Sequence, residues 1–314
     1  MSSRGWLIRL TVRTLTLGYA VLGGLVLFSI VLLAAGKNPL DTYASLVGST
    51  LGSDFGLTEV FVKLIPILFT ALAVAIPARL GLVNVGGEGQ LYSGALFASF
   101  AALALGPQVP AWVGIPVSVV CGMAGGALWA LVPAWLRSTG WLNETISTLL
   151  LNYVALRLVD FFIFGALRDG ASANVPQTVE FGPGWVWPAF VGRIHLGLVL
   201  ALVCLAATAL VLNRTRWGYE IRAVGGNPLA AQRHGLPLSG YVVVVMLAGG
   251  ALAGLAGTGE IMAIQGRLRP HFSPDYGYLG FLVAWLAGHK PLRILLLGFL
   301  VAVVSTGGDS LQLD

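Results

Sequence analysis

Hydrophobic stretches of about 20 residues dominate this chain and predict a series of membrane-spanning helices. Apolar runs fall at 15–35, 59–80, 91–106, 111–136, 143–164, 196–212 and 240–264, and two shorter runs follow at 278–288 and 294–306. A helix of about 20 apolar residues crosses the hydrocarbon core of a bilayer, which is roughly 30 Å thick. We therefore expect an all-α polytopic membrane bundle with about nine visible spans, some of them broken or short.

Glycine interrupts the apolar pattern in two different ways. Polar, glycine-rich stretches at 81–94 and 277–288 predict broken helices, because non-helical backbone survives at membrane depth only where protein or a water-filled cavity satisfies it. The pairs Gly122 with Gly126 and Gly250 with Gly254 have the spacing of small-residue contacts, and they predict close helix packing.

Composition supports a bilayer as the solvent of the whole chain. Hydrophobic residues make up 57% of the 314 residues and charged residues 10%, whereas soluble domains carry roughly 25% charged residues. No stretch has the charge density to solvate a soluble domain. We expect residues 1–314 to form a single transmembrane domain.

The formal net charge of +5 raises the question of a nucleic-acid partner. The basic residues stand at the ends of apolar runs, as the positive-inside rule requires, so no nucleic acid is implied. Arg4, Arg9 and Arg13 precede the first run. The loop 213–238 lies six crossings later and holds the arginines 214, 216, 222 and 233. An even number of crossings returns the chain to the side on which it began, so the N-terminus and the loop 213–238 are both predicted to be cytoplasmic. The segments predicted to lie outside are 37–58, 165–195 and 265–277.

The segment 165–195 contains aromatic residues that are suited to a membrane interface. Trp185 and Trp187 stand among prolines there. Tryptophan is enriched at the membrane–water boundary, so we expect both indoles at the outer interface.

The most informative polar stretch lies between the second and third apolar runs. It inserts Asn84, Glu88 and Gln90 among glycines. An ionisable residue within a membrane normally faces a bundle interior or an aqueous cavity, which makes Glu88 a functional candidate. The alternative is an interfacial turn with a solvated glutamate, and spacing does not choose between them.

A second polar stretch opens the run 143–164. Asn143 can cap the helix and Glu144 complements its dipole, so capping explains both residues without a substrate. Asn152 lies two turns deeper, where a buried amide needs partners or a wet cavity.

Acidic residues also stand near the outer ends of two runs. Glu260 follows a glycine-rich stretch, and Asp160 approaches the end of its own run; either could reach interfacial water. Arg157 precedes Asp160 by three residues, a spacing that predicts an intrahelical ion pair.

The basic loop 215–235 predicts a short cytoplasmic helix. Asn227 can cap it, Pro228 suits its first turn and Gly235 would end it. Leu229, Ala230 and Ala231 would form a small apolar surface for another protein. The alternative is that this helix packs on its own bundle.

Motifs for covalent chemistry and nucleotide binding are missing from the sequence. It contains no phosphate-binding loop, no His-Glu-x-x-His pair and no Gly-x-Ser-x-Gly elbow, and its four histidines are scattered. Cys121 and Cys204 lie in apolar runs, where a disulfide or metal site is not expected. If this membrane protein takes part in ATP-driven transport, the ATP must be bound and hydrolysed by another chain.

Several of these stretches together resemble a known family. Residues 84–90, 144–153, 215–235, 251–257 and 266–277 are similar to the permease subunits of bacterial ABC importers for nucleosides and simple sugars. That superfamily includes the ribose and branched-chain amino acid permeases. Its members usually continue through another apolar helix, so a tenth, C-terminal span is expected to be missing here.

The resemblance implies a transport subunit, not an enzyme, in a bacterial cytoplasmic membrane. It implies a separate ATPase that holds ATP and Mg, a second, paralogous permease and an extracytoplasmic substrate-binding lipoprotein, with no cofactor on this chain. The implied substrate path contains Asn84, Glu88, Gln90, Asn152 and Glu260. The implied ATPase-coupling residues are Gly225, Asn227, Pro228, Ala230, Ala231 and Gly235. Nucleosides are the expected substrates; sugars or branched-chain amino acids are the alternative, and a channel or a membrane enzyme is a remoter one.

Overall fold

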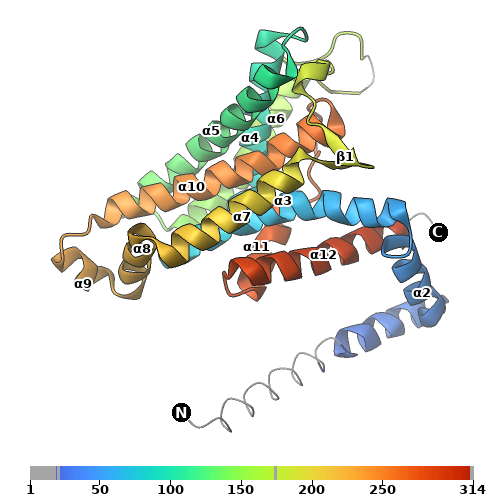
Figure 1. The fold of residues 1–314 in the computed structure, drawn as a ribbon, viewed down its shortest axis with the longest axis horizontal. Helices are drawn as coiled ribbons and strands as arrows, with labels where there is room; N and C mark the ends of the chain where they lie inside the picture. Colours follow the sequence, from blue (N-terminus) through green and yellow to red (C-terminus); the bar gives the residue numbers. More distant parts are fainter. Residues whose placement is uncertain (1–18, 20–21, 173–174, 312–314) are drawn as a thin grey trace.

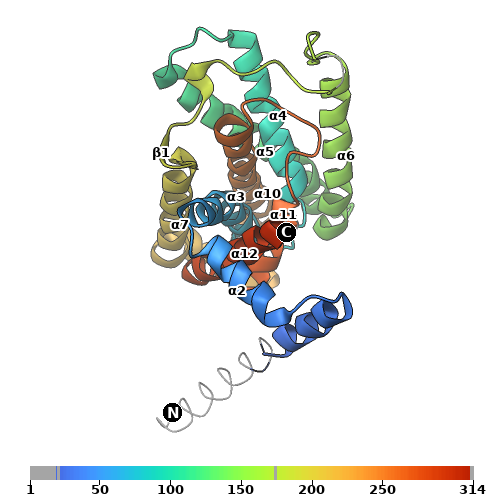
Figure 2. The same ribbon diagram turned by 90° about the vertical axis from the view of Figure 1, so that its right-hand side faces the viewer.

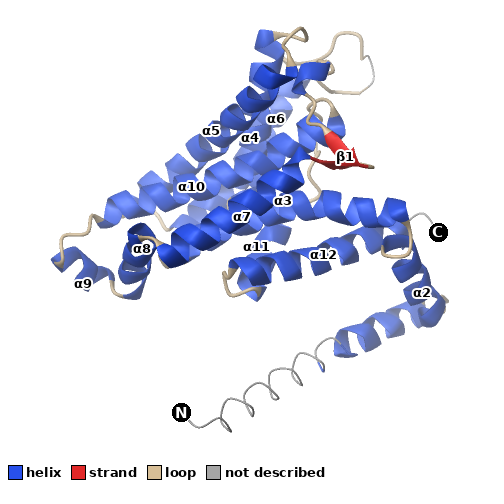
Figure 3. Cartoon of the chain, in the orientation of Figure 1, coloured by secondary structure: helices blue, strands red, loops and turns tan. Residues whose placement is uncertain are grey.

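Helices make up most of the structure, with one short strand pair (Figure 3). The structure is a computed structural model and describes Tyr19 and residues 22–172 and 175–311. The predicted cytoplasmic position of Arg4, Arg9 and Arg13 lies outside the described residues. The all-α polytopic class is confirmed.

The elements follow one another as shown in Figure 1. A helix Leu22–Ala34 precedes α2 (Pro39–Thr50), α3 (Asp54–Ala78), α4 (Gly87–Leu105), α5 (Ala111–Ser138) and α6 (Glu144–Phe164). A 3-10 turn η1 (Pro183–Trp185) and the antiparallel strands β1 (Ala189–Val191) and β2 (Ile194–His195) lead to α7 (Leu196–Arg214). Then come α8 (Arg216–Gly226), α9 (Pro228–Arg233), α10 (Leu238–Gly259), the π-helical turn η2 (Glu260–Gln265), α11 (Tyr276–Leu286) and α12 (Pro291–Leu311).

Six described helices are long and apolar enough to cross a membrane, or seven if the helix Leu22–Ala34 and α2 count as one bent span. The expectation of nine spans is therefore not met. The run 91–106 became α4, whose first turn carries the polar residues Glu88 and Gln90. The run 278–288 became α11, whose 11 residues extend only about 16 Å. The other short run, 294–306, belongs to the 21-residue α12 and is of full length.

The centre of the bundle is α3. Nearly all its residues from Val60 to Pro77 are buried, and α10, α11, α12 and α7 pack around it (Figure 2). A helix that is apolar on all sides gains most by being surrounded. The sequence of α3 therefore specifies a central position.

The two glycine pairs meet where α5 crosses α10. A Cβ added at Gly254 would overlap the carbonyl oxygen of Gly122, and one added at Gly126 would overlap that of Gly250. Helix α4 joins the crossing, because a Cβ at Gly94 would overlap the Cα of Gly254. The predicted close packing through small residues is confirmed.

Trp185 and Trp187 are buried within the protein, and their place at the outer interface stays a prediction. Their exposed fractions are 0% and 1%. The Trp185 indole donates to the carbonyl of Gly106 at 3.0 Å, and the Trp187 indole donates to the hydroxyl of Ser118, also at 3.0 Å. These partners in and before α5 satisfy the indole N–H groups, which allows both rings to be buried within the protein.

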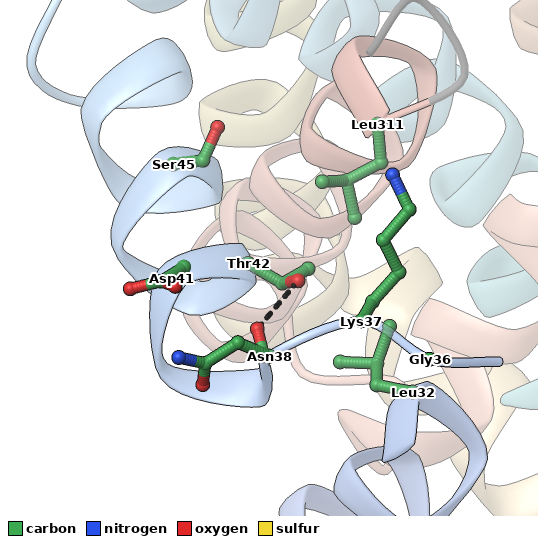
Figure 4. Close-up of a pocket in the computed structure, with 8 residues that line it drawn as sticks. All are labelled: Leu32, Gly36, Lys37, Asn38, Asp41, Thr42, Ser45 and Leu311. Atoms are coloured by element: carbon green, nitrogen blue, oxygen red, sulfur yellow. Dashed lines mark hydrogen bonds between the residues drawn. The ribbon is translucent and has the colours of Figure 1, made fainter. Parts of the chain in front are cut away.

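An arm formed by the helix Leu22–Ala34 and α2 lies beside the end of α12. The two helices differ in direction by 113°. A pocket of about 370 Å³ lies at the bend. In Figure 4 the Lys37 side chain extends toward Leu311, and the Thr42 hydroxyl donates to the carbonyl of Asn38 at 2.9 Å. None of the predicted path residues lines this pocket.

The glycine crossing leads to a stability prediction. We expect Gly254→Leu to lower the free energy of unfolding by about 1–3 kcal/mol, the usual cost of overpacking, because the side chain would push α10 away from α5. The melting temperature of the detergent-solubilised protein measures this. Gly240→Leu is the matched control in the same helix, since a Cβ there would meet only Pro237, at 3.8 Å. Equal melting temperatures for the two variants would contradict the prediction.

Candidate functional site

An extended segment, residues 82–86, connects α3 to α4 inside the bundle. Side chains of α6 hydrogen-bond its backbone. The Val83 amide donates to Oε1 of Glu144 at 3.2 Å, and the Val85 amide donates to the hydroxyl of Thr148 at 3.2 Å. Asn152 donates to the Val85 carbonyl at 2.9 Å and accepts from the Gly89 amide at 2.8 Å. The predicted break near residue 81 is confirmed, and protein groups satisfy its backbone.

The spacing of these three side chains fits the segment they hold. Glu144, Thr148 and Asn152 are four residues apart, which is about 6 Å along a helix. Two residues of extended chain advance about 6.6 Å. Glu144 and Thr148 can therefore meet Val83 and Val85 in turn, and Asn152 reaches Val85 and Gly89.

Glu144 does more than its predicted role at the helix start. It is 4% exposed, and its second carboxylate oxygen lies 2.9 Å from Nε of Arg137. Asn143 is the cap, as predicted, and accepts from the Thr145 amide at 2.8 Å. Glu144 thus links the end of α5 to the 82–86 segment.

Asn84 and Gln90 form a reciprocal amide pair. Asn84 donates to the Gln90 side chain at 3.1 Å, and Gln90 donates to the Asn84 side chain at 3.1 Å. Asn84 also donates to the carbonyl of Ala73 in α3 at 3.2 Å and accepts from the Gly86 amide at 3.0 Å. Both amides are buried, and their hydrogen bonds all go to protein groups. They join α3 to the first turn of α4.

Glu88 connects α4 to α11. Its carboxylate accepts from the Gly277 amide at 2.6 Å, and Glu88 is 2% exposed. Gly277 is required at this contact, because a Cβ there would overlap the backbone nitrogen of Glu88. The run 277–288 is thus a short helix with a glycine contact, and the prediction that it is broken is wrong.

Glu260 lies apart from this network. It begins the π-helical turn η2 and is 7% exposed. Gln265 donates to its carboxylate at 3.4 Å, and Arg193 and Glu59 are the charged groups that face it. No hydrogen bond described for Glu260 reaches the other four predicted path residues.

The basic loop folds into two helices, α8 and α9, where one was predicted. Asn227 caps α9 by accepting from the Ala230 amide at 3.0 Å, Pro228 is its first residue, and Gly235 follows it with φ of +82°. These predicted roles are confirmed.

A pocket of about 600 Å³ opens between α8 and α9, and we call it the α8–α9 groove. It is lined by Arg216, Tyr219, Glu220, Ala223, Asn227, Ala230, Ala231, His234 and Leu236. Ala231 is only 5% exposed, so it is not part of an exposed apolar surface as predicted, whereas Leu229 is 60% exposed. The Tyr241 hydroxyl and then the Arg216 guanidinium hold the pKa of Glu220 below its ordinary value.

Gly225 places α8 directly on the turn that follows α3. A Cβ at Gly225 would overlap the carbonyl oxygen of Arg79 and lie 3.1 Å from Leu80. Leu80 is followed by the 82–86 segment. The α8–α9 groove and the buried polar network are therefore connected by packed backbone.

Comparison with known proteins identifies the family. Residues 56–313 match the family described as the branched-chain amino acid transport system permease component. The chain belongs to this family.

The permease is also similar to individual transport proteins. The glucose ABC transporter permease protein TsgB13 of Haloferax volcanii is 36% identical over 304 residues, covering 93% of this chain and 79% of the relative. The nucleoside ABC transporter permease protein NupB of Lactococcus lactis is 32% identical, covering 94% and 84%. The NupC permease of the same organism is 26% identical, covering 78% and 80%. No solved structure gives a significant match. The resemblance to ABC permeases is confirmed.

The structure brings four of the five predicted path residues of the permease together and leaves Glu260 outside. Thr148, Gly277 and Tyr278 belong to the same network but were not predicted. The spacing of Glu144, Thr148 and Asn152 would have revealed Thr148. Gly277 and Tyr278 had no such signal, because their contacts join distant parts of the chain.

Asn152 gives the sharpest test of this network. We expect Asn152→Leu to lower the free energy of unfolding by about 2–4 kcal/mol, because the Gly89 amide and the Val85 carbonyl would lose a partner in a buried site. Chemical or thermal unfolding in detergent measures the change. Asn213→Leu is the matched control, since Asn213 is exposed and donates only to the Ala209 carbonyl. An effect at Asn152 no larger than at Asn213 would contradict this role.

Proposed function

We propose that this permease forms the membrane path of an ABC importer for nucleosides and couples it to a separate ATPase. The observation that carries the proposal is the α8–α9 groove, which lies in the most basic loop of a chain that belongs to a transport permease family. Similarity to nucleoside and glucose permeases supports a polyhydroxylated substrate. A permease for simple sugars is the second candidate, because the glucose permease is 36% identical.

The ATPase docks at residues 213–238 in this proposal. A surface helix of the partner would contact the rim of the α8–α9 groove, where Ala230 and Asn227 lie. The partner would recognise the shape of α8 and α9. The residues that set this shape would be Gly225, Pro228, Ala231 and Gly235. ATP and Mg would be bound by the partner.

The same proposal sets the topology. The loop 213–238 would be cytoplasmic, as its arginines require under the positive-inside rule, and the N-terminus would lie on the same side. Residues 1–314 would act as one transmembrane domain. Helix α4 is too polar and α11 too short to cross alone, and both would lie beside the path.

In this proposal four buried residues support the wall of the substrate path. They are Asn84, Glu88, Gln90 and Asn152. Their side chains bond to protein groups in this conformation, so contact with substrate requires the network to open during transport. Glu260 would act at the outer end of the path, away from the other four.

Two further partners complete the importer that we propose. A second permease would sit beside this one; similarity to both NupB and NupC of Lactococcus lactis supports a paralogous pair. An extracytoplasmic lipoprotein would deliver substrate to the outer face.

Reconstitution of the purified complex in vesicles tests the substrate. We expect ATP-dependent uptake of labelled uridine or guanosine that exceeds uptake of glucose and leucine. Preferred uptake of glucose would favour the second candidate. Uptake without ATP or the ATPase would indicate a channel and would contradict the proposal.

Filling the α8–α9 groove tests the docking site. We expect Ala230→Trp to reduce both co-purification of the ATPase and uptake by about tenfold or more, because a bulky side chain at a hot-spot position costs over 1.4 kcal/mol. Gln232→Trp is the matched control, since Gln232 lies on α9 but does not line the groove. Normal ATPase binding by the Ala230 variant would remove the groove from the interface.

A further inference from the structure

Arg79 stands where three distant parts of the chain meet. It is the first residue after α3. Its guanidinium donates to the carbonyl of His289 at 2.7 Å, in the turn between α11 and α12. Its own carbonyl oxygen lies against Gly225 of α8. The α11–α12 turn is therefore at the same end of the bundle as the basic loop 213–238 (Figure 1).

The charged groups that face Arg79 are positive. Burial lowers the pKa of Arg79, and the nearby guanidinium of Arg222 lowers it further. Burial and then Arg79 also lower the pKa of His289, so this imidazole is neutral at pH 7. Lys290 and Arg293 follow in the same turn and are exposed. We call the four permanent cations, Arg79, Arg222, Lys290 and Arg293, the Arg79 cluster.

The Arg79 cluster has no acidic partner in the part of the chain that the structure describes. Six ion pairs are found there, and the predicted pair of Arg157 with Asp160, at 3.2 Å, is one of them and is confirmed. None of the six includes a member of the Arg79 cluster. The carboxylates of Glu144 and Glu220, at the same end of the bundle, are paired with other arginines.

Hydrogen-bonding capacity is also left over at this place. Nε of Arg79 and Nε2 of His289 are both buried and have no hydrogen-bond partner. A guanidinium carries five N–H donors, and burial without acceptors costs free energy. Helix α12 begins in the same turn, at Pro291, and its N-terminal end adds partial positive charge. An anion beside the Arg79 guanidinium would supply both acceptors and the opposite charge.

The apolar surroundings indicate which kind of anion fits. The Trp285 ring lies 5.0 Å from the ring of His289 and is exposed. Leu292 and Leu296, one turn apart on α12, are exposed as well. Tryptophan is typical of the membrane–water boundary. A basic turn that continues into an exposed apolar helix face suits a phospholipid, whose phosphate and acyl chains occupy these two regions. An acidic side chain of a partner protein would leave the leucines uncovered.

We propose that the α11–α12 turn and the Arg79 cluster bind the phosphate of an anionic phospholipid. Arginine binds phosphate oxygens through paired N–H donors, which makes it well suited to this role. Since Arg222 belongs to α8 and Lys290 to the turn, the phosphate would bridge these two elements. The proposal takes from the proposed function only the leaflet, which is the cytoplasmic one because of the loop 213–238.

Lipid binding to the purified full-length permease in detergent tests the proposal. Native mass spectrometry counts bound dioleoylphosphatidylglycerol, with dioleoylphosphatidylcholine as the zwitterionic lipid of identical chains. We expect the anionic lipid to bind about tenfold more tightly or better. The double variant Lys290→Gln, Arg293→Gln should lose about tenfold or more of that affinity, because each basic residue near an anionic headgroup contributes roughly fivefold. Raising the salt concentration should weaken the binding.

The matched control removes two other exposed arginines from the same end of the bundle. Arg214→Gln, Arg233→Gln should change the affinity for phosphatidylglycerol by less than about twofold, since neither residue belongs to the Arg79 cluster. The variant Lys290→Arg, Arg293→Lys keeps both charges and should keep the affinity. It separates loss of charge from a disturbed fold, which the melting temperature of each variant also reports.

Three results would overturn the inference. The first is equal affinity for the two lipids. The second is an equal loss of affinity in the two glutamine double variants, which would mean a general attraction to basic surface. The third is unchanged lipid binding by the 290/293 glutamine variant together with lost co-purification of the ATPase, which would mean that the cluster contacts a protein. ATP-dependent uptake is measured separately, so normal uptake beside any of these results leaves the proposed function intact.

Discussion

The structure depends on one constraint of the bilayer, that backbone polar groups away from water must find partners within the protein. The 82–86 segment leaves the helical hydrogen-bond pattern inside the bundle. Helix α6 supplies the missing partners through Glu144, Thr148 and Asn152. Without that face of α6, the extended segment would carry unpaired N–H and C=O groups in a medium that cannot solvate them.

The other features of the core allow this arrangement. Glycines at the crossing of α5 and α10 let these helices and α4 approach until their backbones touch. The apolar α3 fills the centre, and Asn84 anchors the segment to its Ala73 carbonyl. Glu88 then extends the network to α11 through Gly277. The buried groups of the 82–86 segment, α6, Gln90 and Glu88 therefore form one continuous hydrogen-bonded cluster within an apolar bundle.

The position of this cluster relates it to the rest of the molecule. On one side, Leu80 connects it to Gly225 and hence to the α8–α9 groove. On the other, Asn152 connects it to Tyr278 in α11. A movement of α8 or α9 would press on backbone that continues directly into the 82–86 segment, since packed interiors transmit displacement.

The sequence by itself determined the bilayer environment, the helical class, the family, the caps at Asn143 and Asn227, the small-residue contacts and the ion pair of Arg157 with Asp160. Each follows from neighbours along the chain or from a repeated spacing. Only the tertiary structure decided that Trp185 and Trp187 are buried, that α4 and α11 fall short of full spans, and that Glu260 is separate from the other acidic and amide groups. It also decided that Glu144 supports distant backbone and that Arg79 meets the turn between α11 and α12. These facts depend on which helices meet, and pairing between remote segments leaves no periodic trace in either segment alone.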